Sequence, residues 1–364
     1  MNNPLQQDKL QNKKSRIIGY DVARSLAIIG MVMVNYKVVM AASEKGSEWL
    51  VWLVGLLDGR AAATFVILAG IGISMLTHKG RVNQDKEQIR RNQKMLFKRA
   101  VFLFVIGLLY TPLWPADILH FYGVYIAIAA LILTISDRQL WLGATGLSLA
   151  FLILVFIFDY EKGWDFSTLT YLDFWTFSGM FRHIFFNGFH PVIPWLAFIL
   201  IGMWLGRQEV DNIQIRKRIF WMGFSMVAVA ESLSFILVRK FSGEIASVFS
   251  TTPMPPMPLY ILAGAGTSII IIMLCLEITF RYPNSRIFPP LVATGQLALT
   301  LYVAHVVIGM GFLEIIGRLE NQTLSFAIIS AAIFSALAII FSYYWKKRFQ
   351  HGPLEWVIRK ITIG

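Results

Sequence analysis

Asp117 and His120, in the segment ADILHFYG, have the residue types and the spacing of a carboxylate and imidazole pair. Because residues three apart share one face of a helix, the carboxylate can orient the imidazole and fix its tautomer. An imidazole titrates near neutral pH, so this pair is suited to general base catalysis on a hydroxyl or an amine. Two other interpretations stay open: His120 can serve packing through hydrogen bonds, and Asp117 can cap the helix that follows.

Four further polar residues are candidates for the same polar region. His190 stands at the start of a predicted span, and we expect it to share an outer cavity with His120. Tyr302 and His305 share one helical face, and Gln296 lies deeper in the same span. Each of the four can instead satisfy hydrogen bonds between helices. We therefore rank His190 and His305 as reserve bases behind His120.

A second polar set, Asp21, Arg24 and Asn35, lies in the apolar segment RIIGYDVARSLAIIGMVMVNYK. At ~100° per residue the three side chains share a face, which we predict to line a polar interior rather than to contact lipid. Arg24 is suited to hold a phosphate or a carboxylate, with Asp21 orienting it. The alternative is a structural ion pair between Asp21 and Arg24, with the arginine reaching the membrane surface.

Asp58 and Arg60 flank Gly59 in the segment LLDGRAAATFVILAGIGIS. Gly59 predicts a break in the helix, which is tolerated within a membrane only where protein or water satisfies the freed backbone groups. We assign Arg60, with Arg24, to holding phosphate or carbonyl groups of a substrate. The small residues that follow are typical of close helix packing.

The composition is that of an integral membrane protein. The 364 residues are 56% hydrophobic and 15% charged, with a mean hydropathy of +0.61; soluble domains have about 25% charged residues. The single cysteine, Cys275, excludes an intramolecular disulfide framework. The net charge of +12 does not indicate nucleic-acid binding, because the basic residues gather in loops on one side of the predicted membrane.

We predict an all-helical fold with about ten transmembrane spans and both termini in the cytoplasm. The spans are roughly 18–41, 49–77, 98–112, 117–136, 139–159, 189–206, 217–238, 258–280, 288–317 and 323–345. The cytoplasmic segments then contain 24 of the 33 lysine and arginine residues, and the outer segments contain six. We divide the chain into a tail (1–17), a five-helix half (18–159), an outer interfacial loop (160–188), a second five-helix half (189–345) and a tail (346–364).

Three loops and several missing motifs limit the range of possible functions. The segment 78–99 has eight basic residues and is either a topogenic loop facing lipid headgroups or a cytoplasmic entrance for an anionic substrate. The aromatic loop 160–188 predicts an interfacial helix, and TTPMPPMP at 251–258 predicts an extended outer loop. A nucleotide-binding glycine loop, an HExxH motif and a GxSxG motif are all missing from the sequence. We therefore predict no ATP-driven transport and no metal site.

Six motifs in one order resemble a known family. They are DVARSLAIIGMVMVN, GRAAATFVILAGIG, ADILHFYGVY, HPVIPWLAFILIGMWLGR, GQLALTLYVAH and HGPLEWVIRK. Together they resemble the heparan-alpha-glucosaminide N-acetyltransferase-like membrane proteins and their bacterial YeiB-like relatives, over residues 16 to 362. The resemblance implies a fold of ten or eleven spans, in which an acyl group from cytoplasmic acyl-CoA reaches an acceptor on the far side.

One departure from that family bears on catalysis. The resemblance implies a catalytic histidine between the first motif and the second span, but the segment AASEKGSEWLVW has none. Asp21, Arg24 and Asn35 match the opening motif position by position, so the chemistry has to come from another span. This leaves His120 as the expected base.

We therefore predict a plasma-membrane acyltransferase that moves an acyl group, with acetyl as the leading choice, from cytoplasmic acyl-CoA to an outer hydroxyl or amine of a sugar, lipid or small molecule. Arg24, Arg60, Asp21, Asn35 and Asp58 would bind the donor, and a homodimer is possible. The rival prediction is a secondary transporter or exporter, which requires inverted repeats and half-helices that meet near the middle of the bilayer.

Overall fold

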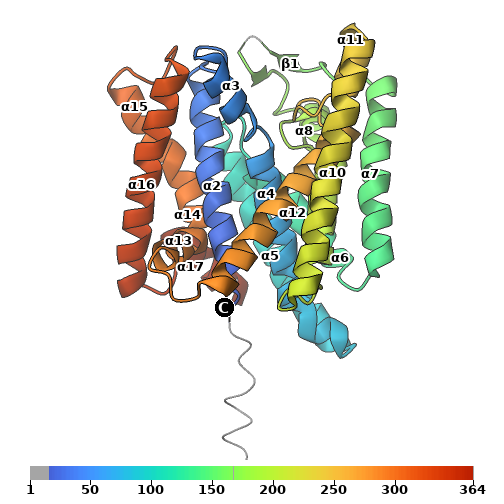
Figure 1. Cartoon of the computed structure of the whole chain (residues 1–364), viewed down its shortest axis with the longest axis vertical. Coiled ribbons are helices and arrows are strands. Elements are labelled where there is room, and N and C mark those ends of the chain that lie inside the picture. The colour runs from blue at the N-terminus through green and yellow to red at the C-terminus, as the bar shows by residue number, and fades with distance from the viewer. Residues whose placement is uncertain (1–15, 167, 364) are drawn as a thin grey trace, which may run out of the picture.

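The computed structural model is a bundle of helices with a single two-stranded hairpin (Figure 1). It describes residues 16–166 and 168–363. The helices are α2 (Ile18–Val39), α3 (Glu48–Gly55), α4 (Arg60–Val82), α5 (Lys86–Tyr110), α6 (Leu119–Leu131), α7 (Asp137–Ile157), α8 (Phe177–Arg182), η1 (His183–Asn187), α9 (Val192–Leu205), α10 (Ile213–Lys240), α11 (Gly243–Val248), α12 (Pro258–Arg281), α13 (Phe288–Gln296), α14 (Ala298–Ala304), η2 (His305–Met310), α15 (Gly311–Ile315), α16 (Leu324–Arg348) and α17 (Pro353–Ile363). The strands β1 (Trp164–Asp165) and β2 (Thr170–Tyr171) pair antiparallel.

The all-helical membrane fold is confirmed, whereas the count of ten spans stays a prediction. In the described residues, seven helical stretches are long and apolar enough to cross a membrane, or eight if the bent pair Phe177–Asn187 and Val192–Leu205 is one span. The predicted spans outside this set are those of α5, whose first half is basic, and α6, which is short. Length and hydropathy alone do not identify these two helices as spans.

The centre of the bundle is formed by α2, α4, α9 and α12, which come from both predicted halves of the chain. Nearly every residue of α9 is buried. In contrast, α7, α10 and α16 have few buried residues and present large apolar side chains outward. Their exposed apolar faces are those expected to contact lipid acyl chains.

The closest helix crossing in this centre joins α4 and α9 through two glycines. A Cβ atom added at Gly202 would lie 2.1 Å from the carbonyl oxygen of Ile67, and one added at Gly70 would lie 2.3 Å from the carbonyl oxygen of Ile199. Only glycine allows the two backbones to approach so closely. The predicted close packing after Gly59 is confirmed at this crossing.

The predicted break at Gly59 is confirmed. Gly59 has a φ of +67° and separates α3 from α4, and the hydroxyl of Tyr260 donates to its carbonyl oxygen at 3.1 Å. The ninth span is interrupted at Leu297, between α13 and α14, and continues through the π-helix η2. The predicted extended loop at 251–258 is confirmed up to Met257, because Pro258 begins α12.

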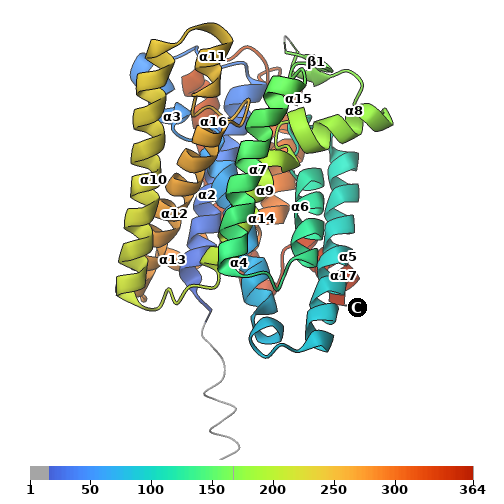
Figure 2. The same cartoon turned by 90° about the vertical axis from the view of Figure 1, so that its right-hand side faces the viewer.

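The loop 160–188 has more structure than a single interfacial helix. It contains the β1–β2 hairpin, the short helix α8 and the π-helix η1. Helix α8 and η1 together meet α9 at an angle of 49°. This loop lies at one end of the bundle, beside the end of α7 (Figure 2).

Two faces of the bundle are used below. The terminal face is the end where residue 16 and α17 lie, together with the turn between α4 and α5 (Figures 1 and 2). The far face is the opposite end, which holds α3, α11, α15 and the β1–β2 hairpin. The first and last described residues therefore lie at the same face.

The glycine crossing predicts a sharp difference between two alanine substitutions. Gly202→Ala places a Cβ against the Ile67 carbonyl and should destabilise the protein by about 1 to 3 kcal/mol through overpacking. Gly146→Ala on α7 is the matched control, because a Cβ at Gly146 has no atom within 4 Å, and it should be neutral or slightly stabilising. Thermal unfolding of both variants in detergent, followed by tryptophan fluorescence, measures the difference. Equal unfolding midpoints for the two variants would contradict the close approach of α4 and α9 at Gly202.

Candidate functional site

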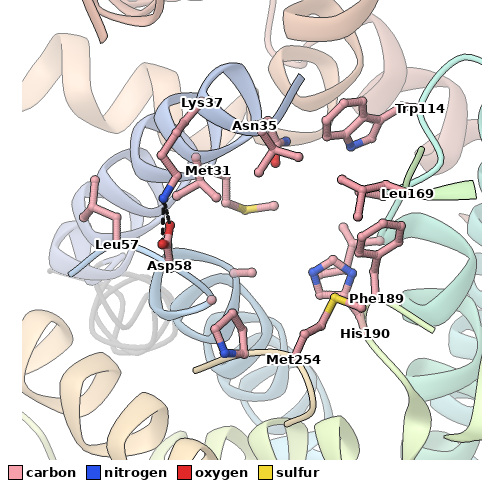
Figure 3. Close-up of a pocket in the computed structure, with 18 of the residues that line it drawn as sticks. Met31, Asn35, Lys37, Leu57, Asp58, Trp114, Leu169, Phe189, His190 and Met254 are labelled. Atoms are coloured by element: carbon pink, nitrogen blue, oxygen red, sulfur yellow. Dashed lines mark hydrogen bonds and ion pairs between the residues drawn. The ribbon is translucent and has the colours of Figure 1, made fainter. Parts of the chain in front are cut away.

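Two cavities enter the bundle from its two faces. The far cavity has a volume of about 290 Å³ and is lined by residues of α2, of the break around Gly59 and of the segments before α6 and α9 (Figure 3). The terminal cavity has a volume of about 310 Å³ and is lined by residues of α2, α4, α5, α6 and α14. Cavities of this size and with a few polar groups among apolar walls are typical of small-molecule sites.

The two cavities are separated by a thin partition, because four elements line both. The pairs, with the residue of the terminal cavity first, are Arg24 and Met31 on α2, Phe65 and Ala62 on α4, Leu119 and Ile118 at the start of α6, and Leu299 and Tyr302 on α14. The wall residues are three positions apart on α4 and on α14, which corresponds to about 4.5 Å at ~1.5 Å per residue, and seven positions apart on α2, about 10 Å. The two cavities therefore approach each other end to end in the middle of the bundle.

A buried ion pair forms one wall of the far cavity. The ammonium of Lys37 donates to both oxygens of Asp58, at 2.5 and 2.6 Å, and Figure 3 shows the pair on the side opposite His190. The Lys37 side chain is 7% exposed and that of Asp58 is 33% exposed. Lys37 thus orients the Asp58 carboxyl group, which lines the cavity and has further acceptor positions.

The other wall of the far cavity carries polar atoms without partners. Among the described residues, the indole nitrogens of Trp114 and Trp195 and Nδ1 of His190 are buried and have no hydrogen bond. The His190 ring lies edge-on to Trp195 at 4.6 Å, and its backbone carbonyl accepts from Tyr125. Because buried polar atoms are normally paired, three unpaired nitrogens on cavity-lining residues mark this wall as a candidate binding surface.

Two arginines line the terminal cavity. Arg24 comes from α2 and Arg99 from α5, and the hydroxyl of Tyr122 between them is buried without a partner in the described structure. Arg99 has neither a hydrogen bond nor an ion pair with the residues that the structure describes. An unpaired guanidinium on a cavity wall is suited to bind phosphate or carboxylate oxygens.

Arg99 was not among the predicted site residues. It ends the basic segment 78–99, and a topogenic role for that segment accounts for its positive charge. The signal available in the sequence is its position. It is the last basic residue before the apolar run AVFLFVIG, so it lies further along α5 than the other basic residues of that loop.

Asp21 lies beside the terminal cavity and is bound to two arginines. Its carboxylate accepts from Arg16 at 2.6 and 2.9 Å and from Arg24 at 3.1 Å. The amide of Gln296 is 3.5 Å away. The hydrogen bond to Asp21 raises the pKa of Arg16 above its ordinary value. Asp21 therefore orients Arg24, which lines the cavity with Gln296.

Glu355, from α17, closes part of the terminal cavity. Its carboxylate accepts from the backbone N–H groups of Leu299 and Thr300, at 2.8 and 3.0 Å, at the start of α14. The break at Leu297 leaves these N–H groups without helical partners, so Glu355 acts as their cap. The C-terminal helix thus stabilises the broken ninth span.

The predicted Asp117 and His120 pair forms, but it is fully buried. His120 Nδ1 lies 2.9 Å from an oxygen of Asp117, whose other oxygen accepts from the Tyr302 hydroxyl at 3.3 Å. Nδ1 therefore carries the proton, and Nε2 is left without a partner among the described residues. Both side chains are 0% exposed, and the two residues line neither cavity. Tyr302, which lines the far cavity, connects this pair to it.

His305 has both of its ring nitrogens satisfied. Nδ1 lies against the carbonyl oxygen of Tyr302 and must donate to it, so Nε2 accepts from the Asn35 amide at 2.9 Å. Asn35 in turn lines the far cavity. The hydroxyl of Tyr36 also donates to the His305 carbonyl at 3.4 Å, within the π-helix η2. His305 therefore holds the first and ninth spans together.

His183, a histidine beside His120, was not among the predicted site residues. The rings of His183 and His120 stack at 5.7 Å, and His183 is buried with Nδ1 unpartnered in the described part of the chain. It lies in η1, within the loop 160–188, which was interpreted as interfacial. Its proximity to His120 depends on how that loop folds back over α6, for which the sequence has no local signal.

Arg60 is directed away from both cavities. Its guanidinium binds Glu231 of α10 at 2.5 Å, and the other Glu231 oxygen accepts from Thr251 at 3.1 Å. It lines neither the far nor the terminal cavity. Among the predicted donor-binding residues the structure thus places Arg24 in the terminal cavity and Asn35 and Asp58 in the far one. Within residues 16–166 and 168–363, no cluster of three histidine, cysteine or acidic residues could hold a metal ion.

Comparison with known families adds an independent observation. A family model described as heparan-alpha-glucosaminide N-acetyltransferase, catalytic, matches residues 16–240, which is more than half of the chain. A second model, described as a protein of unknown function (DUF418), matches residues 204–364. No curated protein matches the chain. The first match includes both walls of the far cavity up to Trp195, and it suggests a transmembrane acetyltransferase family. The sequence resemblance is therefore confirmed, and the chain belongs to the heparan-alpha-glucosaminide N-acetyltransferase family, with the DUF418 model, that of the YeiB-like proteins, matching its C-terminal part.

Proposed function

We propose that this protein transfers an acyl group, with acetyl as the leading choice, from cytoplasmic acyl-CoA to a hydroxyl or amine on the other side of the cell membrane. The observation that carries this proposal is the pair of cavities that approach each other from opposite faces. A donor and an acceptor that never share a compartment can meet at such a partition. Holding both in place converts a bimolecular reaction into a step between neighbouring groups.

The terminal cavity is the proposed donor site. Arg99 and Arg24 are placed to bind phosphate groups of acyl-CoA, and the basic turn between α4 and α5 lies at the same face. The positive-inside rule assigns that face to the cytoplasm, together with both termini. This assignment puts the donor site on the side where acyl-CoA is available.

The far cavity is the proposed acceptor site. Asp58, held by Lys37, can accept from an acceptor hydroxyl or ammonium, and Asn35 lies nearby on α2. The free N–H groups of Trp114 and Trp195 can donate to acceptor oxygens. These groups favour an acceptor with several oxygen atoms, such as an envelope sugar, a lipid headgroup or a small polar molecule.

His190 is the proposed general base. Unlike His120, His190 lines the far cavity itself, and its Nδ1 has no hydrogen-bond partner among the described residues, which favours it as the group that takes a proton from a bound acceptor. As the acceptor oxygen or nitrogen attacks the thioester carbonyl, His190 takes its proton; the carbon–sulfur bond then breaks and the thiolate leaves with the electron pair. His120, our choice from the sequence, needs a rearrangement that uncovers Nε2, so we assign Asp117 and His120 to holding Tyr302 at the partition.

Donor binding should depend on Arg99. Arg99→Gln removes a free guanidinium from the terminal cavity and should weaken acetyl-CoA binding about 10- to 100-fold, the range expected for one or two charge-assisted hydrogen bonds. Arg90→Gln is the matched control, since it makes the same charge change on an exposed part of α5. Isothermal titration calorimetry of the purified protein measures both. An equal loss in the two variants, or no binding to the unmodified protein, would overturn the donor site.

Substitution of His190 should lower turnover without changing the affinity for the donor. His190→Gln should lower acetyl transfer from labelled acetyl-CoA to an extract of envelope glycans and lipids by roughly 10²- to 10⁴-fold, with donor affinity unchanged. His78→Gln, at an exposed histidine on α4, controls for loss of a histidine as such. If His190→Gln retains full turnover while His120→Gln loses it, the base is His120 and the active conformation must uncover Nε2.

A further inference from the structure

A groove on the outer surface of α5 is lined by residues that complement the two parts of a phospholipid, the charged headgroup and the apolar acyl chain. Lys94 and Lys98 stand at one end of it, one helical turn apart, and Phe97, Val101 and Val105 line the rest. Ile361 of α17 forms part of its wall. The groove has a volume of about 570 Å³, and its lining is almost entirely apolar beyond the two lysines.

The two lysines are free to bind an anion. Both are exposed, and neither forms an ion pair with the residues that the structure describes. They lie in the part of α5 nearer the terminal face, since α5 begins there with Lys86. A lysine at this depth can place its ammonium among lipid headgroups while its methylene groups cover apolar surface.

The dimensions of the groove match one membrane leaflet. From Lys94 to Val105 is eleven residues, about 16 Å at ~1.5 Å per residue. One leaflet contributes about half of the ~30 Å hydrocarbon core. Phe97, Val101 and Val105 have exposed apolar side chains. An acyl chain would cover them, whereas a free phosphate would not.

We propose that this groove is a binding site for an anionic phospholipid of the leaflet at the terminal face. Its phosphate binds Lys94 and Lys98, and one acyl chain runs along α5 between Phe97 and Val105. This proposal does not depend on the acyltransferase function.

Such a lipid would also hold the C-terminal helix in place. Ile361 faces the groove, while Glu355, on the same helix, caps α14 at the terminal cavity. Helix α17 packs beside the lower part of α5, as Figure 2 shows. Lipid bound at the groove therefore contacts, through Ile361, the helix that contributes Glu355 to the terminal cavity.

Lipid titration of the full chain in a nonionic detergent tests the proposal. Native mass spectrometry should detect one tightly bound phosphatidylglycerol, whereas phosphatidylcholine with the same acyl chains should bind much more weakly. The variant K94Q/K98Q should bind phosphatidylglycerol roughly 30-fold more weakly, given about 1 kcal/mol for each lysine near the headgroups. K217Q/R218Q makes the same charge change at exposed residues of α10 and should retain the site.

Two further measurements separate the headgroup from the acyl chain. Val101→Trp, at an exposed position, should block the groove and abolish tight binding while both lysines remain. Glycerol 3-phosphate, which has the headgroup phosphate and no chains, should neither bind tightly nor raise the unfolding temperature. Equal binding of the two phospholipids, an equal loss in K217Q/R218Q, or full binding of glycerol 3-phosphate would overturn the proposal. So would a dimer that forms through this groove without bound lipid.

Discussion

Every polar group that this chain carries into the membrane has to be satisfied within the protein, because hydrocarbon offers no hydrogen bonds. The structure meets this constraint mostly with pairs that join distant segments. Lys37 binds Asp58, Arg60 binds Glu231, and His305 is bound by Asn35 and by its own helix. These pairs link α2, α4, α10 and the broken ninth span, so the polar residues also determine how the helices are arranged.

Some of the exceptions to this constraint lie in the two cavities, and others, such as His120 Nε2 and His183 Nδ1, lie in the packed interior. In the described structure, the polar groups left without partners include Arg99 and the Tyr122 hydroxyl in the terminal cavity. Trp114, Trp195 and His190 are the corresponding groups in the far cavity. Leaving such groups unpaired costs stability, which a bound molecule can recover. The two cavities therefore combine volume with unused hydrogen-bonding capacity.

Local features of the fold could be predicted from the sequence, and long-range pairings could not. The break at Gly59, the Asp21 and Arg24 pair and the Asp117 and His120 pair all depend on residues near each other in the chain. The partner of Arg60, Glu231, is 171 residues away in the chain. That Arg60 lies outside both cavities therefore follows only from how α4 packs in the bundle. Arg99 and His183 were missed for a related reason: their environment is created by helices and loops that pack over them. Similarly, the burial of His120 results from the tertiary packing around it, which the three-residue spacing between Asp117 and His120 does not predict.

The central claim is that a donor at one face and an acceptor at the other meet across the partition. Proteoliposomes with a known orientation, established by the accessibility of a C-terminal tag, test it most directly. Labelled acetyl-CoA, which does not cross the bilayer, is supplied on one side and the envelope extract on the other. The account predicts labelled acceptor only when acetyl-CoA faces the terminal face and the extract faces the far face. Transfer only when both substrates are on the same side, or movement of an unmodified solute without acylation, would contradict it.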